Sequence, residues 1–429
     1  MPKKKEILVV AFALFSLFFG AGNLILPPLL GFKSGMAWPW VTLGFALSAV
    51  LVPIFGILAH ARLQGTLFDI AKKVSPTFSL AYCYLIYAVS ISLPSPRTAS
   101  VTHEMAILPL FDSSSWLTST LYFTLVFVFV MNRSKILTLV GKILTPTILI
   151  ILLAIILTTV FGFEFTFAPS VYASSFTHGI LEGYQTFDAI GAVVVGGVII
   201  ISVNLKYRDL AFEEKRNLIG RAGIFAGLGL FLVYSGLILS GALMQGEFGA
   251  TISRTELLNG ISFTTLGTSG RLFLSVLVSL ACFTTAVGIV TGTADFVQGR
   301  FNESKKAYSI TAVVGCILGV VMGQFDVGYI ITVALPALMF MYPVTIVLIF
   351  LNLLPEKWAA KTIFQWVVGV TLLFSIPDFL NSVGWGNALS AFTRWIPFSD
   401  FHMGWVLPAL LTFVVFNVIS KESRWLSGG

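Results

Sequence analysis

Two short stretches of this sequence place glycines beside polar side chains inside otherwise apolar runs. The first reads FSLFFGAGNLILPP, from Phe15 to Pro28, and the second reads TFDAIGAVVVGG, from Thr186 to Gly197. Glycine weakens a helix and tandem proline stops one, so we expect unwound backbone in both stretches. Unwound backbone exposes N–H and C=O groups that can bind ions and charged ligands.

The first stretch has the composition of an anion-binding turn. Gly20, Ala21 and Gly22 leave little side chain around the backbone. If a helix begins near Asn23, its N-terminus points free N–H groups and positive partial charge at the same spot. The alternative interpretation is a close contact between two helices through small residues, which is common in membranes.

The composition requires lipid as part of the solvent. The chain has 429 residues, of which 57% are hydrophobic and 10% charged, whereas soluble domains carry about 25% charged residues. The net charge of +7 does not indicate nucleic-acid binding, because the basic residues lie in short loops between apolar runs. We expect one membrane domain and a lipid bilayer as its surroundings.

Cysteine and histidine give no sign of a metal site or an enzyme. Cys83, Cys282 and Cys316 lie inside apolar segments, so neither a disulfide framework nor metal-type spacing is expected. The four histidines are far apart, and no HExxH, GxSxG or P-loop motif is present. The sequence therefore predicts a protein that is not an enzyme.

A helix that spans a bilayer needs about 20 mostly apolar residues, and twelve segments meet this description. They are residues 6–32, 37–59, 77–102, 115–131, 136–161, 183–204, 218–243, 271–293, 307–323, 328–352, 362–380 and 404–420. The run after the basic N-terminus has no cleavage site and is expected to stay as the first helix.

Basic residues predict the orientation of these segments. With a cytoplasmic N-terminus, 21 of the 26 Lys and Arg residues fall on the cytoplasmic side and 5 on the other. Cytoplasmic loops of membrane proteins carry such an excess. We therefore expect both termini in the cytoplasm of a multi-pass membrane protein.

The interrupted first and sixth segments occupy corresponding positions in two sets of five. The halves are residues 1–162 and 183–352, and residues 353–429 add two further helices. Unwound backbone is tolerated in a membrane only where it is buried in protein or lines a wet cavity. Paired interruptions of this kind point to a transporter site near the midplane.

Four motifs make the chain resemble the branched-chain amino acid:cation symporter family, the BrnQ-like transporters. They are FFGAGNLILPP (Phe18–Pro28), SPRTAS (Ser95–Ser100), GKILTP (Gly141–Pro146) and CFTTAVG (Cys282–Gly288). The resemblance implies the leucine-transporter fold, with inverted five-helix repeats and discontinuous helices 1 and 6. It also implies symport of leucine, isoleucine and valine, usually with sodium, and a bacterial inner-membrane location.

The resemblance assigns a substrate site to the two interrupted helices. The carboxylate of an amino acid would bind at Gly20, Ala21, Gly22 and Asn23. The carbonyls near Phe187 and Asp188 would accept its ammonium group. Asp188 is an ionisable residue within or beside a membrane segment and so a functional candidate, although it can equally cap the first turn of the helix that follows.

Two further residues of the second stretch, Ile190 and Gly191, are assigned to the same pocket. An apolar residue such as Ile190 can line a cavity for an apolar side chain, or it can simply pack against its neighbours. The sequence leaves both interpretations open.

The coupling ion would lie between helices 1 and 8. By the pattern of the fold, the carbonyls of Ser16 and Phe19 face Thr284 and Thr285, whose hydroxyls lie about 100° apart on a helix. Oxygen ligands of this kind suit sodium. The alternative is that both threonines hydrogen-bond their own helix.

Three charged residues are candidates for gating or coupling. Arg97 pairs with Glu104, lines the outer entrance, or is an interfacial arginine that extends to water. Lys142, near the start of helix 5, either reaches the ion position and couples transport to protons or extends outward at the cytoplasmic end. The alternative function is therefore a proton-coupled carrier, or a symporter of another neutral solute such as alanine or a nucleobase.

Overall fold

The structure is a computed structural model that describes residues 4–132, 136–207, 209–386 and 393–426. Its described residues form helices joined by turns and loops, without a strand. The first part of the chain holds α1 (Lys4–Phe18), α2 (Ala21–Ser34), α3 (Trp38–Ala46), α4 (Val52–Leu63), α5 (Leu67–Ala71), α6 (Pro76–Ser92), α7 (Pro94–Thr102), α8 (Ser115–Asn132) and α9 (Ile136–Gly162). The second part holds α10 (Ser175–Tyr184), α11 (Asp188–Lys206), α12 (Phe212–Leu243), α13 (Arg254–Arg300), α14 (Lys305–Gly323), α15 (Val327–Leu353), α16 (Lys361–Ser382) and α18 (Val406–Leu426).

Each of the twelve expected segments overlaps one or more of these helices. Eight helices among the described residues are long and apolar enough to cross a membrane. Single π-helical turns join α3 to α4 at Leu47–Leu51 and extend α7 at His103–Ile107. The all-helical, polytopic fold class expected from the sequence is confirmed.

Large apolar side chains cover much of the outer surface. Trp40, Leu232 and Phe273 are each more than half exposed, and α12 and α13 carry several more like them. A soluble protein rarely exposes contiguous apolar surface of this kind. These faces contact lipid when the protein lies in a bilayer.

Glycines bring the central helices into backbone contact. A Cβ on Gly31 of α2 would lie 1.7 Å from the carbonyl oxygen of Ile238, and one on Gly241 of α12 would lie 1.9 Å from that of Pro28. The same reciprocal approach joins α3 to α10 through Gly44 and Gly179. Small residues that permit such contacts are typical of membrane helix packing.

Tandem proline does not end the second helix, so the expectation that it would was wrong. Pro27 and Pro28 lie inside α2, which continues to Ser34. Proline removes backbone donors, but membrane helices tolerate this where neighbouring helices hold the backbone. Here the close packing of α2 on α12 supplies that support.

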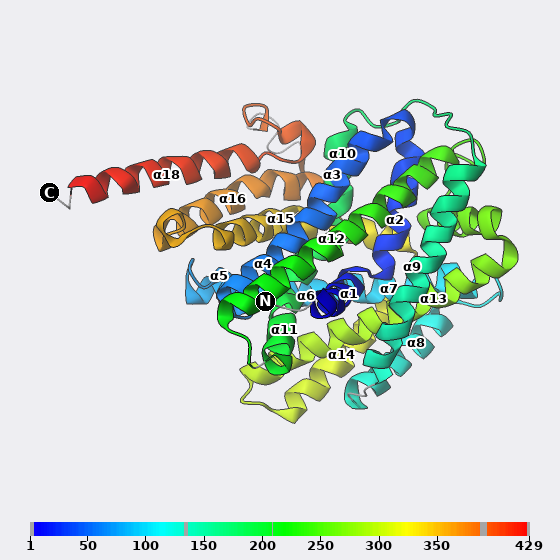
Figure 1. The fold of residues 1–429 in the computed structure, drawn as a ribbon, viewed down its shortest axis with the longest axis horizontal. Coiled ribbons are helices and arrows are strands. Elements are labelled where there is room, and N and C mark those ends of the chain that lie inside the picture. The colour runs from blue at the N-terminus through cyan, green and yellow to red at the C-terminus, as the bar shows by residue number, and fades with distance from the viewer. Residues whose placement is uncertain (1–3, 133–135, 208, 387–392, 427–429) are drawn as a thin grey trace.

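In Figure 1, α4 and α12 run side by side across the centre of the view, and α2 lies on the other side of α12. α16 and α18 lie together on one side, with α18 outermost. α13 was expected to begin near residue 271, but it starts at Arg254 and bends at Gly267, where φ is 68°. Only glycine adopts this backbone readily, so residues 254–266 form a separate helical stretch before the bend.

Candidate functional site

The first interruption, called here the first break, consists of Phe19 and Gly20. α1 ends at Phe18 and α2 begins at Ala21. The Gly20 amide donates to the Phe18 carbonyl (2.9 Å), and the Asn23 amide donates to the Gly20 carbonyl (3.0 Å). The second half-helix therefore starts two residues earlier than expected, and Ala21 and Gly22 form its first turn.

The second break consists of Gln185, Thr186 and Phe187, between α10 and α11. The expected segment 183–204 is therefore wrong at its start, because α10 already begins at Ser175. Phe187 adopts the left-handed region (φ 62°, ψ 12°) directly before Asp188 opens α11. Such a backbone is rare and strained for a bulky residue, and strained residues cluster at functional sites.

The two breaks meet through Asn23 and Asp188. The Asn23 Nδ2 atom lies 2.8 Å from both carboxylate oxygens of Asp188, 2.7 Å from the Phe18 carbonyl and 3.0 Å from the Tyr234 hydroxyl. Asn23 and Asp188 are both buried, at 2% and 6% exposure. One amide has two hydrogens for these four acceptors, so Asp188 keeps acceptor capacity for another donor.

Asp188 does not cap α11. The N-cap residue is Phe187, whose own side chain makes no capping hydrogen bond. The Asp188 amide donates to the Thr186 hydroxyl (3.2 Å), and the next amide, Ala189, donates to the Tyr342 hydroxyl (3.2 Å). The Asp188 carboxylate is thus free of the helix terminus and faces Asn23.

Arg97 holds the second break from α7. Its guanidinium donates to the Gln185 carbonyl at 2.7 Å and lies 5.4 Å from the centroid of the Phe187 ring. The residue is 5% exposed, so it does not extend to water in this structure. The expected ion pair with Glu104 is not formed, and the Glu104 carboxylate accepts from other donors.

Glu104 lies at the end of the bundle where α13 begins. It accepts from the Thr255 hydroxyl (2.5 Å) and from the Val327 amide (2.8 Å). Arg254 forms an ion pair with Glu182 of α10 at 2.7 Å. These contacts connect the start of α13 to the turn that extends α7 and to α10, the helix that precedes the second break.

The carbonyl that was expected to bind an ammonium group is already used. The Phe187 carbonyl accepts from the Gly191 amide at 2.7 Å. Ile190 is 1% exposed and packs in a buried apolar cluster. A methyl group added to Gly191 would meet no heavy atom within 4 Å, so space remains beside this glycine.

Thr284 and Thr285 lie on α13, as expected for helix 8. Both hydroxyls donate to the Ala281 carbonyl at 2.9 Å, which is the self-bonded arrangement. A Cβ on Gly20 would lie 3.6 Å from the Thr285 Oγ1 atom. Thr285 therefore borders the first break, where Phe19 is buried and Ser16 occupies the last turn of α1. Lys142 belongs to α9, but its side chain lies outside the described residues.

Three residues of this site were missed by the sequence reasoning. Tyr234 of α12 and Tyr342 of α15 are fully buried and bond to Asn23 and Ala189, in the first turns of the helices that follow the two breaks. Gln185 supplies the carbonyl that Arg97 binds. A tyrosine inside an apolar helix needs a hydrogen-bond partner when buried, and this signal marks both tyrosines in the sequence.

A family model described as branched-chain amino acid transport protein matches residues 3–423. The chain belongs to this family. It is 31% identical to the branched-chain amino acid transport system 2 carrier protein of Pseudomonas aeruginosa, covering 97% of this chain and 96% of the relative. It is 30% identical to the branched-chain amino acid permease BraB of Bacillus subtilis, with the same coverage.

Membership in this family confirms the resemblance that the four motifs carry. It also makes the chain a transport protein rather than an enzyme, as the sequence predicted. The relatives are bacterial, and the protein is a multi-pass membrane protein.

Solved structures show the leucine-transporter-type fold. The inward-facing conformation of Mhp1 aligns with a TM-score of 0.59 at 13% identity, covering 98% of this chain and 91% of that one. MhsT in complex with L-phenylalanine aligns with a TM-score of 0.56 at 16% identity, covering 97% and 98%. The expected fold is therefore confirmed.

Proposed function

We propose that this family member is a secondary active transporter that carries leucine, isoleucine and valine into the cytoplasm together with sodium, by alternating access. The observation that carries the proposal is the contact of the two breaks, in which a buried carboxylate on α11 faces a buried amide on α2. The family and the printed names of its relatives support the substrate class.

The zwitterion of an amino acid matches this contact in charge. Its ammonium group would donate to Asp188, which retains acceptor capacity. Its carboxylate would accept from Asn23 and from the N-terminal turn of α2, where the helix dipole favours negative charge. Substrate would thus replace the direct Asn23–Asp188 bond, and the space beside Gly191 would receive part of an apolar side chain.

Sodium would bind between the first break and α13. Each threonine hydroxyl donates its hydrogen to Ala281, which leaves its oxygen lone pairs to coordinate a cation. The carbonyls of Ser16 and Phe19 would complete an oxygen shell of the kind that hard cations prefer. The position of Thr285 beside Gly20 supports this arrangement.

The topology follows the charge asymmetry of the loops. Both termini would be cytoplasmic, with residues 1–162 and 183–352 as inverted repeats and residues 353–429 as two additional helices.

Sodium would order the first break from outside and raise substrate affinity through linkage. Filling both sites would favour closure of the outer path and opening of the inner one.

Radiolabelled leucine uptake into proteoliposomes tests the proposal. We expect an inward sodium gradient to drive uptake and an inward proton gradient to leave it at the background level. Uptake driven by protons alone would keep the carrier, remove the sodium site and turn attention to Lys142 and Asp188. Saturable uptake of alanine or a nucleobase without leucine uptake would overturn the substrate class.

The ion site has its own test in the Thr284→Ala/Thr285→Ala variant. Both hydroxyls only bond their own helix, so the variant should fold with little change in thermal stability. We expect leucine binding to lose its sodium dependence. Unchanged sodium dependence in the folded variant would remove Thr284 and Thr285 from the ion site.

A further inference from the structure

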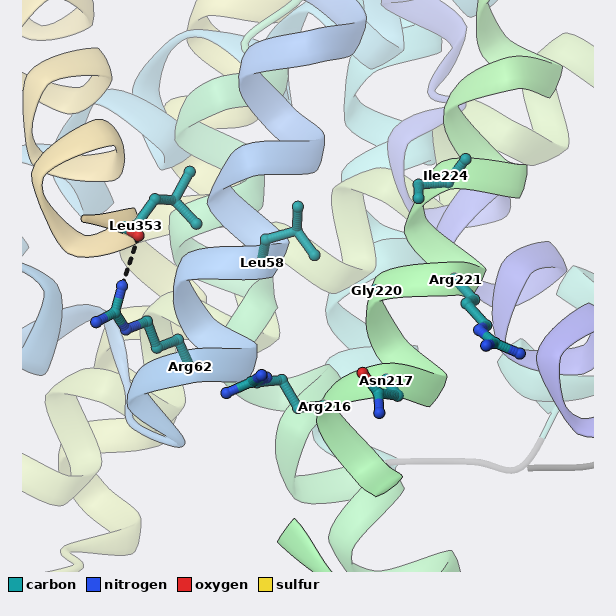
Figure 2. Close-up of a pocket in the computed structure, with 8 residues that line it drawn as sticks. All are labelled: Leu58, Arg62, Arg216, Asn217, Gly220, Arg221, Ile224 and Leu353. Carbon is teal, nitrogen blue, oxygen red and sulfur yellow. Dashed lines mark hydrogen bonds between the residues drawn. The ribbon is translucent and has the colours of Figure 1, made fainter. Parts of the chain in front are cut away.

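A basic groove lies between α4 and α12, away from the two breaks (Figure 2). It has a volume of about 530 Å³, and its lining includes Arg62 of α4 with Arg216, Asn217 and Arg221 of α12. Figure 2 shows Arg216 extending toward Arg62, while Arg221 leaves the other side of α12 one turn further on. Arg62 and Arg216 therefore lie on the same side of α12, and Arg221 lies on its other side.

The arginines of this groove retain donors for a ligand. Arg62 donates to the Leu353 carbonyl at 2.5 Å, which fixes the position of its guanidinium group. The guanidinium has five N–H donors, so others remain for a ligand. Arg216 pairs with Glu213 at 2.9 Å, but both side chains are about half exposed, at 46% and 61%. Exposed pairs of this kind contribute little, so an anion that binds Arg62 and Arg216 together can replace Glu213.

The floor of the groove is apolar and shaped by a glycine. A Cβ on Gly220 would lie 3.5 Å from the Leu58 side chain, so the absence of a side chain here leaves the space between the two helices open. Leu58 and Ile224 line the end of the groove that leads into the apolar part of the helices. The site is thus basic at one end and apolar at the other.

Exposed apolar rows also lie further along both helices, on the side of Leu58 and Ile224 that leads away from the arginines in the sequence. On α12 they are Ile224, Leu228 and Leu232, each more than half exposed and four residues apart. On the helix that includes α3 and α4 they are Leu43, Leu47 and Leu51, also exposed and four residues apart. Residues four apart share one helix face, so each row forms a strip that faces lipid.

We propose that this groove binds the phosphate headgroup of an anionic phospholipid, whose acyl chains lie along the two apolar rows. Guanidinium forks match phosphate oxygens in geometry as well as in charge. A free phosphate would use the arginines alone, whereas a phospholipid uses the basic end and both apolar rows. The match of the whole surface favours the lipid, which would bridge α4 and α12.

Native mass spectrometry of the purified protein with added phosphatidylglycerol tests this site. We compare wild type with Arg62→Gln/Arg216→Gln, which removes both positive charges and keeps a polar side chain at each position. Each basic residue near anionic lipid contributes about 1 kcal/mol, so the double variant should bind phosphatidylglycerol about 25-fold more weakly. The single variant Arg216→Gln, on an exposed side chain, serves if the double variant does not fold.

The matched control is Lys305→Gln/Lys306→Gln, which removes the same charge from exposed positions at the start of α14. We expect it to bind phosphatidylglycerol as wild type does. Equal loss in both double variants would show a nonspecific charge effect and overturn the site, as would unchanged binding in Arg62→Gln/Arg216→Gln. Thermal stabilisation by inorganic phosphate as large as that by phosphatidylglycerol would overturn the lipid as the source of the phosphate.

Discussion

The two breaks differ in how their backbones are held. In the first break Gly20 is followed by the small residues Ala21 and Gly22, and a methyl group on Gly20 would make only an ordinary contact with Thr285. The second break is built from large and polar side chains, with Phe187 in a strained conformation and Arg97 bonded to the Gln185 carbonyl. One break leaves backbone accessible, and the other is fixed by side chains from a different helix.

This difference suggests a division of labour between the breaks. A glycine-lined break can adapt its backbone to an ion or a carboxylate, because few side chains must move. A break fixed by Arg97, Thr186 and Tyr342 keeps the Asp188 carboxylate in one place. Substitutions at the second break should therefore affect transport more than equally small changes at the first.

The largest effect is expected from Asp188→Asn. The variant keeps side-chain volume and an acceptor for Asn23, and it removes a buried charge, so the protein should fold. A hydrogen bond to a charged group contributes about 2–3 kcal/mol, which predicts a loss of leucine affinity of about 30- to 100-fold. Leucine binding to the purified variant measures this directly.

Asp378→Asn is the matched control for Asp188→Asn. Asp378 is also a buried carboxylate, at 5% exposure, but it lies in α16 and contacts His402. We expect leucine affinity close to wild type in this variant. If Asp188→Asn binds leucine as well as Asp378→Asn does, the ammonium group does not bind Asp188.

A smaller effect is expected from Arg97→Gln. The change removes a charged donor from the Gln185 carbonyl and the cation from the Phe187 ring. Losing about 1.5 kcal/mol of this interaction should lower the uptake rate about tenfold, with a smaller change in KM, because the break is less well fixed. Proteoliposome uptake at several leucine concentrations separates the two parameters.

Arg271→Gln provides the comparison for Arg97→Gln. Arg271 also lies over a phenylalanine ring, at 5.3 Å from the centroid of Phe263, but this ring is 49% exposed and belongs to neither break. The uptake rate of Arg271→Gln should match wild type. A similar decrease in both variants would mean that Arg97 acts only through general stability.

The helical segments could be predicted because lipid leaves few alternatives. A spanning segment must satisfy its backbone internally, so each apolar run of sufficient length predicts one helix. The second break was placed less well, since the glycines after Asp188 suggested that unwinding extended to Gly197. In the structure, Gly196 packs against His60, because a Cβ added to this glycine would lie 2.3 Å from the imidazole ring. The unwound residues lie before Asp188 instead.

The contacts between the breaks could not be predicted from the sequence. Asn23 and Asp188 are 165 residues apart, and only the packing of α2, α11 and α12 brings them together with Tyr234. The conformation of Phe187 was also hidden, because no residue type there signals a positive φ. Asn23 and Asp188 were identified singly, since polar groups inside apolar helices attract notice wherever they lie.

The smallest effect is expected from Gly20→Ala, which tests the first break alone. Gly20 has φ −86° and ψ 159°, an extended conformation open to any residue, so alanine should fold there without strain. Its methyl group would lie 3.6 Å from the Thr285 hydroxyl, beside the proposed ion. We expect a few-fold loss of apparent sodium affinity, with leucine uptake at saturating sodium close to wild type.

Gly31→Ala is the control for Gly20→Ala, because Gly31 lies at a close helix contact. Its methyl group would overlap the Ile238 carbonyl at 1.7 Å, so we expect a markedly lower melting temperature or loss of folded protein. If Gly20→Ala destabilises the protein as strongly, the first break is a close helix contact and not an adaptable binding turn. If only the sodium affinity of Gly20→Ala changes, the glycine at the first break serves the ion rather than the packing of the helices.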